Sequence, residues 1–310
     1  MDGHANRSGG GKVRMPSKND TGLDGVSLMH LAVPKGRIEA GVTGLLAAAG
    51  IELRSGPRGY RPVPSVPGYE VKLLKPQTIV EMLVAGSRDA GFAGADWVAE
   101  KDADLVELLD TGLDPVSMVV AAPESLLEAG ALPGRPLVVA SEYERLTRRW
   151  IEQRGLAATF VRSHGATEVF PPEDADVIVD ITATGETLAA NHLVVVEELF
   201  RSSTRLYANP AALDSPEKKT AIEALVMTLR SVLEARERAM VELNVTKDEL
   251  ESVIAILPSM REPTIAHLHR GDGLSVKAAV PRRDLPQLIP NLKERGATDI
   301  AVSQLEQIVP

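Results

Sequence analysis

Short runs of apolar residues alternate with stretches of helical periodicity along the first two thirds of the chain. The apolar and β-branched runs predict strands at residues 28–33, 69–74, 89–93, 115–122, 136–140, 159–161 and 177–180. Helices are predicted between them, for example up to Ala49 and from about Thr78 to Ala85. Because strands that alternate with helices form parallel-rich sheets, this order favours an α/β fold. A second lobe is expected to begin near residue 115, and the chain is expected to return near residue 200.

A long helix is predicted to begin after Ser215, with Ser as the N-cap and Pro216 at the first helical position. Apolar residues then recur at helical spacing as far as Met240 and Leu243. This spacing predicts one apolar stripe that packs in the core or against a second copy of the chain.

The remaining residues predict a small module. Thr246 and Glu249 have the spacing of a capping box, which indicates another helix before a break at Pro258. A strand at 263–268, a turn at 271–273, a strand at 274–280, a helix at 285–295 and a strand at 298–302 follow. This order is most of a ferredoxin-like βαββαβ unit, a kind of module that often binds amino acids or regulates.

Length, charge and composition narrow the classes of function. The 310 residues permit two or three modules. The net charge of -9 argues against general nucleic-acid binding, which rests on clustered Lys and Arg. Cysteine is absent, so disulfides, thiolate metal sites and cysteine nucleophiles are excluded.

No segment approaches the roughly 18 to 20 continuous apolar residues that a membrane-spanning helix needs, so we expect no membrane partner. Residues 1–26 are rich in Gly, Ser, Asn and Asp and lack the apolar core of a secretory signal. We therefore expect a disordered tail there and a cytoplasmic location.

Residues 176–188 carry the strongest chemical signal. A β-branched strand ends at Asp180, and Thr184, Gly185 and Thr187 follow at a predicted helix N-terminus. Hydroxyls and unpaired N–H groups at such a terminus attract anions, while Asp180 is placed to accept hydrogen bonds from the hydroxyls of a ribose. The combination favours a phosphoribosyl group. The alternative is an ordinary strand, turn and capped helix, because Gly- and Thr-rich turns are common.

Two further turns carry candidate groups for a nucleotide. Lys35 and Arg37 follow the first strand, where they would neutralise phosphates, Arg with a forked donor set and Lys as a point charge. The alternative is a solvated basic turn. Gly91 and Gly94 precede Asp96, and such small residues let a ligand approach the backbone. Asp96 would accept hydrogen bonds from a nucleotide or ribose; the alternative is a simple helix cap.

These segments resemble ATP phosphoribosyltransferase, the first enzyme of histidine biosynthesis. Residues 176–193 are similar to its phosphoribosyl-diphosphate loop, residues 31–37 to its opening strand and Pro-Lys-Gly-Arg turn, and residues 89–96 to its Gly-x-x-Gly-x-Asp turn. Residues 165–168 resemble its small-residue turn that ends in Glu168. Residues 258–265 are similar to part of the regulatory domain of the family's long form, and the likeness covers nearly everything from residue 27 onward.

The resemblance implies a two-lobed catalytic region like a type II periplasmic binding protein, with the substrates in the cleft between the lobes. A small ferredoxin-like α+β domain would follow. Residues 27–115 with 200–244 would form the first lobe, residues 116–199 the second lobe with the phosphoribosyl-diphosphate loop, and residues 245–310 the regulatory domain.

The resemblance also implies transfer of phosphoribosyl from phosphoribosyl diphosphate to N1 of ATP, with Mg²⁺ and with feedback inhibition by histidine. Lys35, Arg37 and Asp180 would be catalytic. The substrate-binding residues would be Lys75, Asp96, Glu168, Asp180, Thr182, Ala183, Thr184, Gly185, Glu186, Thr187 and Leu188, and the regulatory residues Pro263, Thr264 and Ile265. Homodimers that assemble into homohexamers are the implied assembly.

None of the six histidines stands in an arrangement that suggests a general base. The implied reaction needs none, because N1 of neutral adenine attacks through a lone pair and has no proton to lose. His267 and His269 would share a strand face, but the four ligands of a usual structural zinc site are not evident. No metal site made by the protein alone is therefore predicted.

The chain departs from the family pattern at residues 73–78, where relatives commonly have an Arg and, a few residues on, an Asp. Lys75 replaces the Arg, and Thr78 stands near the expected Asp. Because Lys cannot reproduce bidentate contacts, nucleotide binding on this side would be altered. The alternative function is accordingly a catalytically inactive two-lobed paralogue that binds ligands or regulates.

Overall fold

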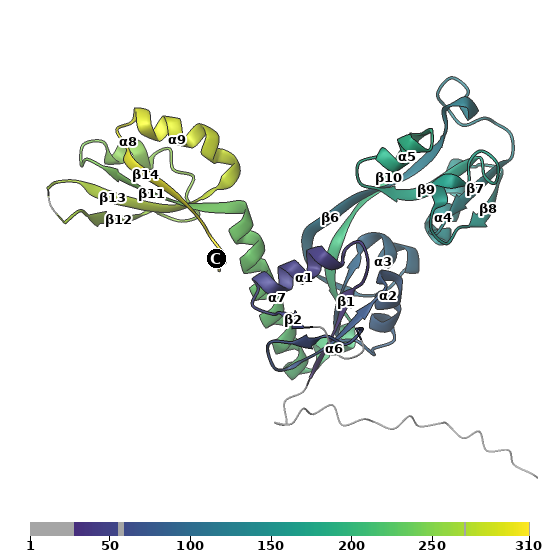
Figure 1. Cartoon of the computed structure of the whole chain (residues 1–310), viewed down its shortest axis with the longest axis horizontal. Helices are drawn as coiled ribbons and strands as arrows, with labels where there is room; N and C mark the ends of the chain where they lie inside the picture. Colours follow the sequence, from purple (N-terminus) through teal and green to yellow (C-terminus); the bar gives the residue numbers. More distant parts are fainter. Residues whose placement is uncertain (1–27, 55–58, 270, 310) are drawn as a thin grey trace, which may run out of the picture.

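The structure is a computed structural model that describes residues 28–54, 59–269 and 271–309. It has two lobes and a smaller C-terminal unit, which the long helix α7 (Pro216–Glu237) joins to the lobes (Figure 1). The predicted tail, residues 1–26, lies outside the described residues. Within the described ranges, no helix is both long and apolar enough to cross a membrane.

The first lobe is built on three parallel strands, each followed by a helix. Strand β1 (Met29–Pro34) lies between β4 (Tyr69–Leu74) and β5 (Ala90–Gly94). Helices α1 (Glu39–Ala48), α2 (Pro76–Val84) and α3 (Ala95–Lys101) follow these strands in turn, and a short hairpin of β2 (Leu53–Arg54) and β3 (Val63–Pro64) precedes β4. The elements predicted for this lobe are confirmed.

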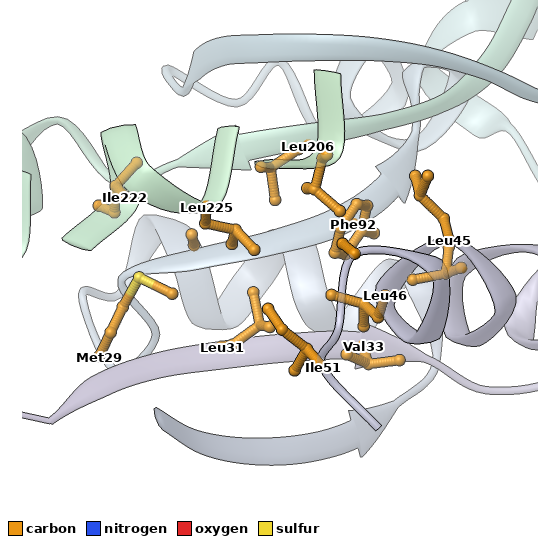
Figure 2. Close-up of a cluster of buried hydrophobic side chains, with 14 of the residues drawn as sticks. Met29, Leu31, Val33, Leu45, Leu46, Ile51, Phe92, Leu206, Ile222 and Leu225 are labelled. Carbon is orange, nitrogen blue, oxygen red and sulfur yellow. The ribbon is translucent and has the colours of Figure 1, made fainter. Parts of the chain in front are cut away.

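The core of the first lobe joins the sheet to α1 and α7 (Figure 2). Leu31 and Phe92 of the parallel strands are fully buried, as is Leu46 of α1. Ile222 and Leu225 of α7 pack in the same cluster. Since burying a large apolar side chain contributes about 1.5–3 kcal/mol, α7 is held firmly to this lobe. The predicted apolar stripe is thus a core stripe over this part of the helix.

Two long antiparallel strands connect the lobes. Strand β6 (Val106–Pro123) carries the chain out of the first lobe, and β10 (Leu193–Ala208) brings it back, paired from Leu193↔Pro123 to Ala208↔Val106. They lie at the centre of one eight-stranded sheet with the order β4-β1-β5-β10-β6-β9-β7-β8. The sequence pattern predicted only the second half of β6 and did not predict β10 as a strand.

The second lobe repeats the strand–helix pattern. Strand β7 (Leu137–Ser141) lies between β9 (Val177–Thr182) and β8 (Ala158–Arg162) in parallel pairs. Helix α4 (Glu144–Arg154) follows β7, and the five-residue α5 (Glu186–Ala190) follows β9. The four predicted strand positions of this lobe are confirmed, with β6 longer than expected.

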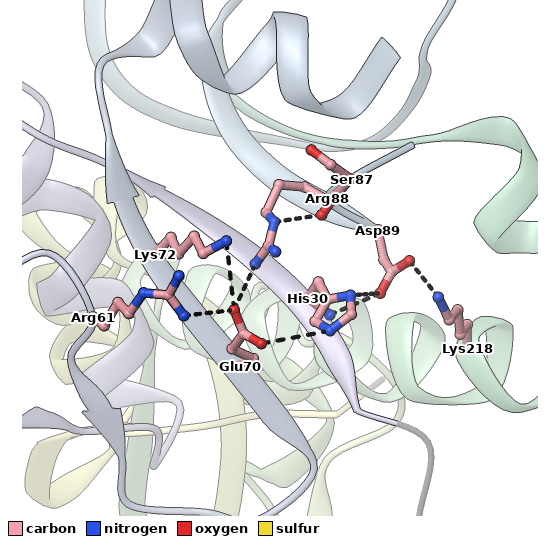
Figure 3. A network of polar contacts seen from close by, with 8 residues as sticks. All are labelled: His30, Arg61, Glu70, Lys72, Ser87, Arg88, Asp89 and Lys218. Carbon is pink, nitrogen blue, oxygen red and sulfur yellow. Dashed lines mark hydrogen bonds and ion pairs between the residues drawn. The ribbon is translucent and has the colours of Figure 1, made fainter. Parts of the chain in front are cut away.

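A polar network holds the amino-terminal edge of the first sheet to α7 (Figure 3). Asp89 accepts a hydrogen bond from the His30 backbone N–H at 2.7 Å and one from Lys218 Nζ, in the first turn of α7, at 2.8 Å. Glu70 accepts a hydrogen bond from Arg88 at 3.3 Å. Because Asp89 is buried, its ion pair with Lys218 ties the first turn of α7 to this edge of the sheet. The network lies at the strand edge opposite the carboxyl ends.

The C-terminal unit confirms the predicted ferredoxin-like arrangement. Its elements are β11 (Arg238–Val245), α8 (Leu250–Ile254), β12 (Thr264–His267), β13 (Leu274–Pro281), α9 (Leu285–Glu294) and β14 (Thr298–Gln304). The sheet is antiparallel with the order β12-β13-β11-β14, and both helices lie on one face of it (Figure 1). In the first lobe, the short helix α6 (Pro210–Asp214) directly precedes α7.

The helix predicted through Met240 and Leu243 is wrong beyond Glu237. Residues 238–245 form β11, in which buried and half-buried positions alternate strictly. Val241, Leu243 and Val245 face the core of the C-terminal unit, so a period of two describes these residues better than a period of 3.6. A boundary before Arg238 therefore fits this sheet better than the predicted one at Val245. At α8, Thr246 and Glu249 hydrogen-bond to each other at 2.7 Å.

Candidate active site

A pocket of about 340 Å³ lies where the two lobes meet the crossover strands, β6 and β10, which connect them. Its walls come from both lobes and from β6 and β10. The lining residues are Lys35, Arg37, Ile38, Lys75, Pro76, Gln77, Gly94, Asp96, Trp97, Asp114, Val116, Glu142, Tyr143, Asp180, Ile181, Ser202, Ser203 and Thr204. A larger groove of about 550 Å³ on the second lobe, around Trp150 and Phe200, contains none of the predicted site residues.

The carboxyl ends of the parallel strands supply the polar groups of the pocket. Lys35 follows β1, Lys75 follows β4, and Asp96 lies just after β5. From the second lobe, Glu142 follows β7 and Asp180 lies near the end of β9. This placement agrees with the rule that ligands of open α/β sheets bind beyond the carboxyl ends of the strands. The structure thus brings five predicted site residues together: Lys35, Arg37, Lys75, Asp96 and Asp180.

Cations form the wall of the first lobe. Lys35, Arg37 and Lys75 are exposed, and Lys35 Nζ lies 4.1 Å from the centre of the Tyr60 ring. Gly36 has φ +95°, which only glycine adopts easily, and its N–H donates to Glu39 Oε2 at 3.1 Å. The turn therefore places two exposed cationic side chains, Lys35 and Arg37, in the pocket lining.

Asp180 is the principal carboxylate of the opposite wall. Burial raises its pKa to about 6, and the nearby charges of Glu142 and Glu168 act in the same direction. A hydrogen bond from the Ile181 backbone N–H to Asp180 Oδ1, at 2.7 Å, opposes the rise. A cation or a pair of hydroxyl donors at this position would satisfy a carboxylate that the protein leaves poorly solvated.

Asp96 has protein partners on both carboxylate oxygens. Ser202 Oγ donates to Oδ1 at 2.6 Å, and Tyr143 Oη donates to Oδ2 at 2.8 Å. The residue is 4% exposed. These bonds use one acceptor position on each oxygen and leave fewer positions for the predicted role, acceptance from a nucleotide or ribose. That role stays a prediction, and the structure gives the residue a second one between the lobes.

The predicted phosphate loop continues from Asp180 but does not line the pocket. Gly185, with φ +81°, donates its N–H to Thr182 Oγ1 at 2.9 Å, which closes the turn before α5. Ala183, Thr184, Glu186 and Thr187 are exposed, and Leu188 is buried against the second lobe. Glu168, in a short 3-10 turn, is also outside the lining and acts on Asp180 through its charge.

The three predicted regulatory residues lie far from this pocket, at the start of the edge strand β12. Thr264 lines a groove of about 400 Å³ with Met240, Met260 and Lys277, while Ile265 is 44% exposed and Pro263 precedes the strand. His267 ends β12. Within the described ranges, no three His, Asp or Glu side chains are grouped as a metal site.

Sequence reasoning missed Glu142, Tyr143 and Ser202. Glu142 and Tyr143 could have been found, because they follow the predicted strand at 136–140 directly, as Asp180 follows its own strand. Ser202 could not, since the strand that carries it was not predicted.

Comparisons with known proteins show the family to which the chain belongs. The family profile described as ATP phosphoribosyltransferase matches residues 75–231, and one described as HisG, C-terminal domain, matches residues 235–307. The ATP phosphoribosyltransferase of Pelotomaculum thermopropionicum is 35% identical over 91% of this chain and 99% of its own length. That of Natronomonas pharaonis is 37% identical over 91% of this chain and 100% of its own length.

A solved structure is similar as well. The ATP phosphoribosyl transferase (HisG:HisZ) complex from Thermotoga maritima contains a chain that matches 67% of this one and 99% of its own length, with a TM-score of 0.60 and 27% identity.

Proposed function

The chain belongs to the ATP phosphoribosyltransferase family, and from that premise we propose that it transfers phosphoribosyl from phosphoribosyl diphosphate to N1 of ATP, the first step of histidine biosynthesis. The observation that carries the proposal is the pocket in which three cations of one lobe face Asp180 of the other. Two polyanionic substrates need such a cationic wall, and a ribose needs an acceptor opposite it.

In this proposal the two walls divide the work. Lys35, Arg37 and Lys75 neutralise the phosphates of the substrates, and Asp180 accepts hydrogen bonds from the ribose hydroxyls. As the bond from C1 to the pyrophosphate oxygen lengthens, the ribose gains positive charge, which the Asp180 carboxylate stabilises. The lone pair of adenine N1 attacks C1, so no side chain has to remove a proton. Holding both substrates in one pocket contributes roughly 7 to 11 kcal/mol to lowering the barrier.

Mg²⁺ is the ion that the family implies, and the residues present fit it as a companion of the pyrophosphate. Mg²⁺ usually binds through one or two carboxylates together with substrate phosphates. Glu142, which lines the pocket beside Asp180, would hold the ion. When bound, the ion would supply positive charge that stabilises the leaving pyrophosphate.

An assay with purified protein, ATP, phosphoribosyl diphosphate and Mg²⁺ tests the proposal directly. We expect near-ultraviolet absorbance to rise as phosphoribosyl-ATP forms, and the rise to require both substrates. A folded protein that binds either substrate but makes no product would instead support the inactive paralogue suggested by Lys75 and Thr78.

Thr187→Val tests the phosphate loop, because it keeps the approximate shape of the side chain and removes the hydroxyl. Thr187 is exposed, so we expect the unfolding temperature to stay the same. Losing a charge-assisted hydrogen bond to the 5′-phosphate should cost about 1.5–3 kcal/mol in kcat/KM for phosphoribosyl diphosphate. Thr220→Val on the exposed side of α7 is the matched control. Equal kinetics for the two variants would remove Thr187 from the site.

We further propose that the C-terminal unit binds histidine and that bound histidine inhibits transfer. The groove beside Thr264 supports this, because Ile308 and Val309 of the chain's last segment also line it. That segment contacts the first lobe: Gln307 Nε2 donates to the Ala48 carbonyl at 3.1 Å, and the Ile308 N–H donates to the Ser231 carbonyl at 3.0 Å. Ala48 ends α1, the helix that follows the turn of Lys35 and Arg37.

Gln307→Ala should weaken the coupling between the groove and the pocket. One neutral hydrogen bond contributes about 0.5–1.5 kcal/mol, so we expect activity at saturating histidine to rise roughly two- to tenfold, with little change in uninhibited activity. Gln304→Ala on β14 is the control. If calorimetry detects no histidine binding to the intact chain at millimolar concentration, the regulatory proposal fails; if histidine inhibits both variants alike, only this route for the coupling fails.

A cytoplasmic location and assembly into homodimers and homohexamers stay predictions. Light scattering on the purified protein would measure the assembly. The strands β12 and β14 form the two edges of the C-terminal sheet and are mostly exposed, which leaves edges for contact between copies.

A further inference from the structure

A buried hydrogen bond joins the two lobes beside the pocket. Tyr143, at the start of α4 in the second lobe, donates from Oη to Asp96 Oδ2 in α3 of the first lobe, 47 residues away in sequence. Tyr143 is 2% exposed and Asp96 4%. Ser202 of the crossover strand β10 completes the set: its Oγ donates to Asp96 Oδ1 at 2.6 Å, and the Asp96 N–H donates to that Oγ at 3.1 Å. We call Asp96, Tyr143 and Ser202 the lobe latch.

Other contacts between the same helices reinforce the latch. The Trp97 and Tyr143 rings lie 4.6 Å apart between their centres. Glu100 of α3 accepts hydrogen bonds from the backbone N–H groups of Arg145 and Leu146, both at 3.0 Å. These donors lie in the first turn of α4 and have no partner within their own helix. A side chain of the first lobe therefore caps a helix of the second, which makes α3 and α4 one packed contact.

The latch is tied directly to the reactive side of the second lobe. Ser141 Oγ donates to the Val179 carbonyl at 2.6 Å and accepts from the Tyr143 N–H at 2.9 Å. Asp180 follows Val179 in the sequence, and Glu142 lies between Ser141 and Tyr143. Moving Tyr143 relative to Asp96 would therefore move both pocket carboxylates relative to Lys35 and Lys75.

We propose that the lobe latch sets the closure of the two lobes and that Tyr143 is a positioning residue for phosphoribosyl transfer. The expected effect on kcat rests on the proposed function, whereas the expected effect on the distance between the lobes does not depend on it. Tyr143 acts through Glu142 and Asp180, by fixing how far these carboxylates lie from the cations of the first lobe. Transfer between two bound substrates depends steeply on such distances, since a misplacement of about 1 Å can cost roughly 100-fold in rate.

The Tyr143 hydroxyl of the latch stays protonated. Burial and the neighbouring Asp96 carboxylate raise the pKa of Tyr143 far above its ordinary value, so its hydroxyl remains a donor at every pH at which the protein would be assayed. Glu142 and Asp180 face Tyr143 as well and act in the same direction. Deprotonation of Tyr143 therefore does not switch this hydrogen bond.

Tyr143→Phe tests the proposal because it deletes the hydroxyl and keeps the ring against Trp97. Tyr207→Phe is the matched control, since Tyr207 is equally buried at 3% exposure but lies in the first lobe outside the pocket lining. We expect kcat to fall at least tenfold in Tyr143→Phe, with KM for each substrate changing less than threefold, and both values to stay near wild type in Tyr207→Phe.

Interlobe distance provides a second readout that does not depend on activity. The chain contains no cysteine, so Ala85→Cys on the first lobe and Glu152→Cys on the second would carry the only spin labels. We expect the measured distance distribution to broaden or shift in Tyr143→Phe and to stay unchanged in Tyr207→Phe. Equal distributions in all three backgrounds would overturn the latch, even if the protein proves to lack transferase activity.

A double-mutant cycle separates positioning from general destabilisation. If Tyr143 positions Glu142 and Asp180 only by its hydrogen bond to Asp96, the two substitutions should not add. The double variant Asp96→Asn with Tyr143→Phe should then have a kcat no more than twofold below that of Asp96→Asn alone. Thermal unfolding of each variant accompanies the kinetics. A kcat that stays at the wild-type value while Tyr143→Phe lowers the unfolding temperature would show that the contact only stabilises the fold, which would overturn the positioning role.

Discussion

Asp180→Asn should lower kcat/KM for phosphoribosyl diphosphate by about 100-fold or more while leaving the protein at least as stable as before. The loss is expected because an amide cannot stabilise the positive charge that develops on the ribose, and removing one preorganised electrostatic contact typically costs about 100- to 1000-fold. Asn keeps the size and the acceptor oxygen of Asp, so the contact with the Ile181 N–H survives. Steady-state kinetics with both substrates measure the loss.

The stability of this variant should depend on pH with a defined sign. Burial raises the pKa of Asp180 from 3.8 to about 6, so between these values the folded protein binds more protons than the unfolded chain. Wild-type stability therefore falls as pH rises through this window. Asn removes the poorly solvated charge. The unfolding temperature of the variant minus that of wild type should accordingly be larger at pH 8 than at pH 5.

Asp176→Asn is the matched control, because Asp176 directly precedes the same strand and its partners, Arg135 and Val138, lie outside the pocket lining. A hydrogen bond from Arg135, at 2.7 Å, lowers the pKa of Asp176. Its contribution to stability is therefore present above pH 3.8 and lost as pH falls below it. This variant should be less stable than wild type at pH 8 and should keep its activity.

The pH dependence of kcat/KM gives an independent check on Asp180. In the free enzyme, the acid limb of the profile should fall with an apparent pKa of about 6, and the residual activity of Asp180→Asn should lack that limb. If Asp180→Asn keeps full activity, or loses as much unfolding temperature as Asp176→Asn at pH 8, then Asp180 is a structural residue and the ribose acceptor lies elsewhere.

The sequence predicted elements that show a continuous apolar run or a clear helical period. The strand–helix repeats of both lobes and the ferredoxin-like order of the C-terminal unit fall in this class. The sequence pattern failed to predict strands that depend on pairing between residues far apart in the chain. The first half of β6 contains Asp110, Gly112 and Asp114, which are residues typical of turns. Asp110 nevertheless pairs with Arg205 of β10, while Gly112 and Asp114 fall at register shifts on either side of the Leu113↔Thr204 pair.

The candidate site divides in the same way. Lys35, Lys75 and Asp180 could be predicted because each follows a recognisable strand, and parallel strands deliver such residues to one edge. The contact of Asp96 with its two hydroxyl partners could not be predicted. Tyr143 and Ser202 come from another lobe and from an unpredicted strand, and no local pattern records that their hydroxyls meet one carboxylate. Helix periodicity likewise hid β11, because its apolar residues also fit the end of the preceding stripe.

Replacing both Lys35 and Arg37 with Met should reduce kcat/KM for both substrates by about 100-fold or more with almost no effect on the fold. Both side chains are exposed at the pocket. Replacing them therefore removes the positive charge that stabilises the substrate phosphates and the leaving pyrophosphate. The free energy of unfolding should change by less than about 0.5 kcal/mol, the usual range for surface substitutions. Met is chosen because its sulfur retains contact with the Tyr60 ring, over which Lys35 lies.

The double variant Arg149→Met with Arg230→Met is the control for charge alone, since it removes two exposed cations that lie outside this pocket. Long-range attraction of anionic substrates would be reduced equally in both double variants and is screened by salt, whereas contacts in the pocket are screened less. We therefore expect the loss in Lys35→Met with Arg37→Met to persist at 0.5 M salt and the control to match wild type there. If the two double variants have the same kcat/KM at high salt, the turn after β1 is a solvated basic turn, and the phosphates must be held by Lys75 and the loop after Asp180.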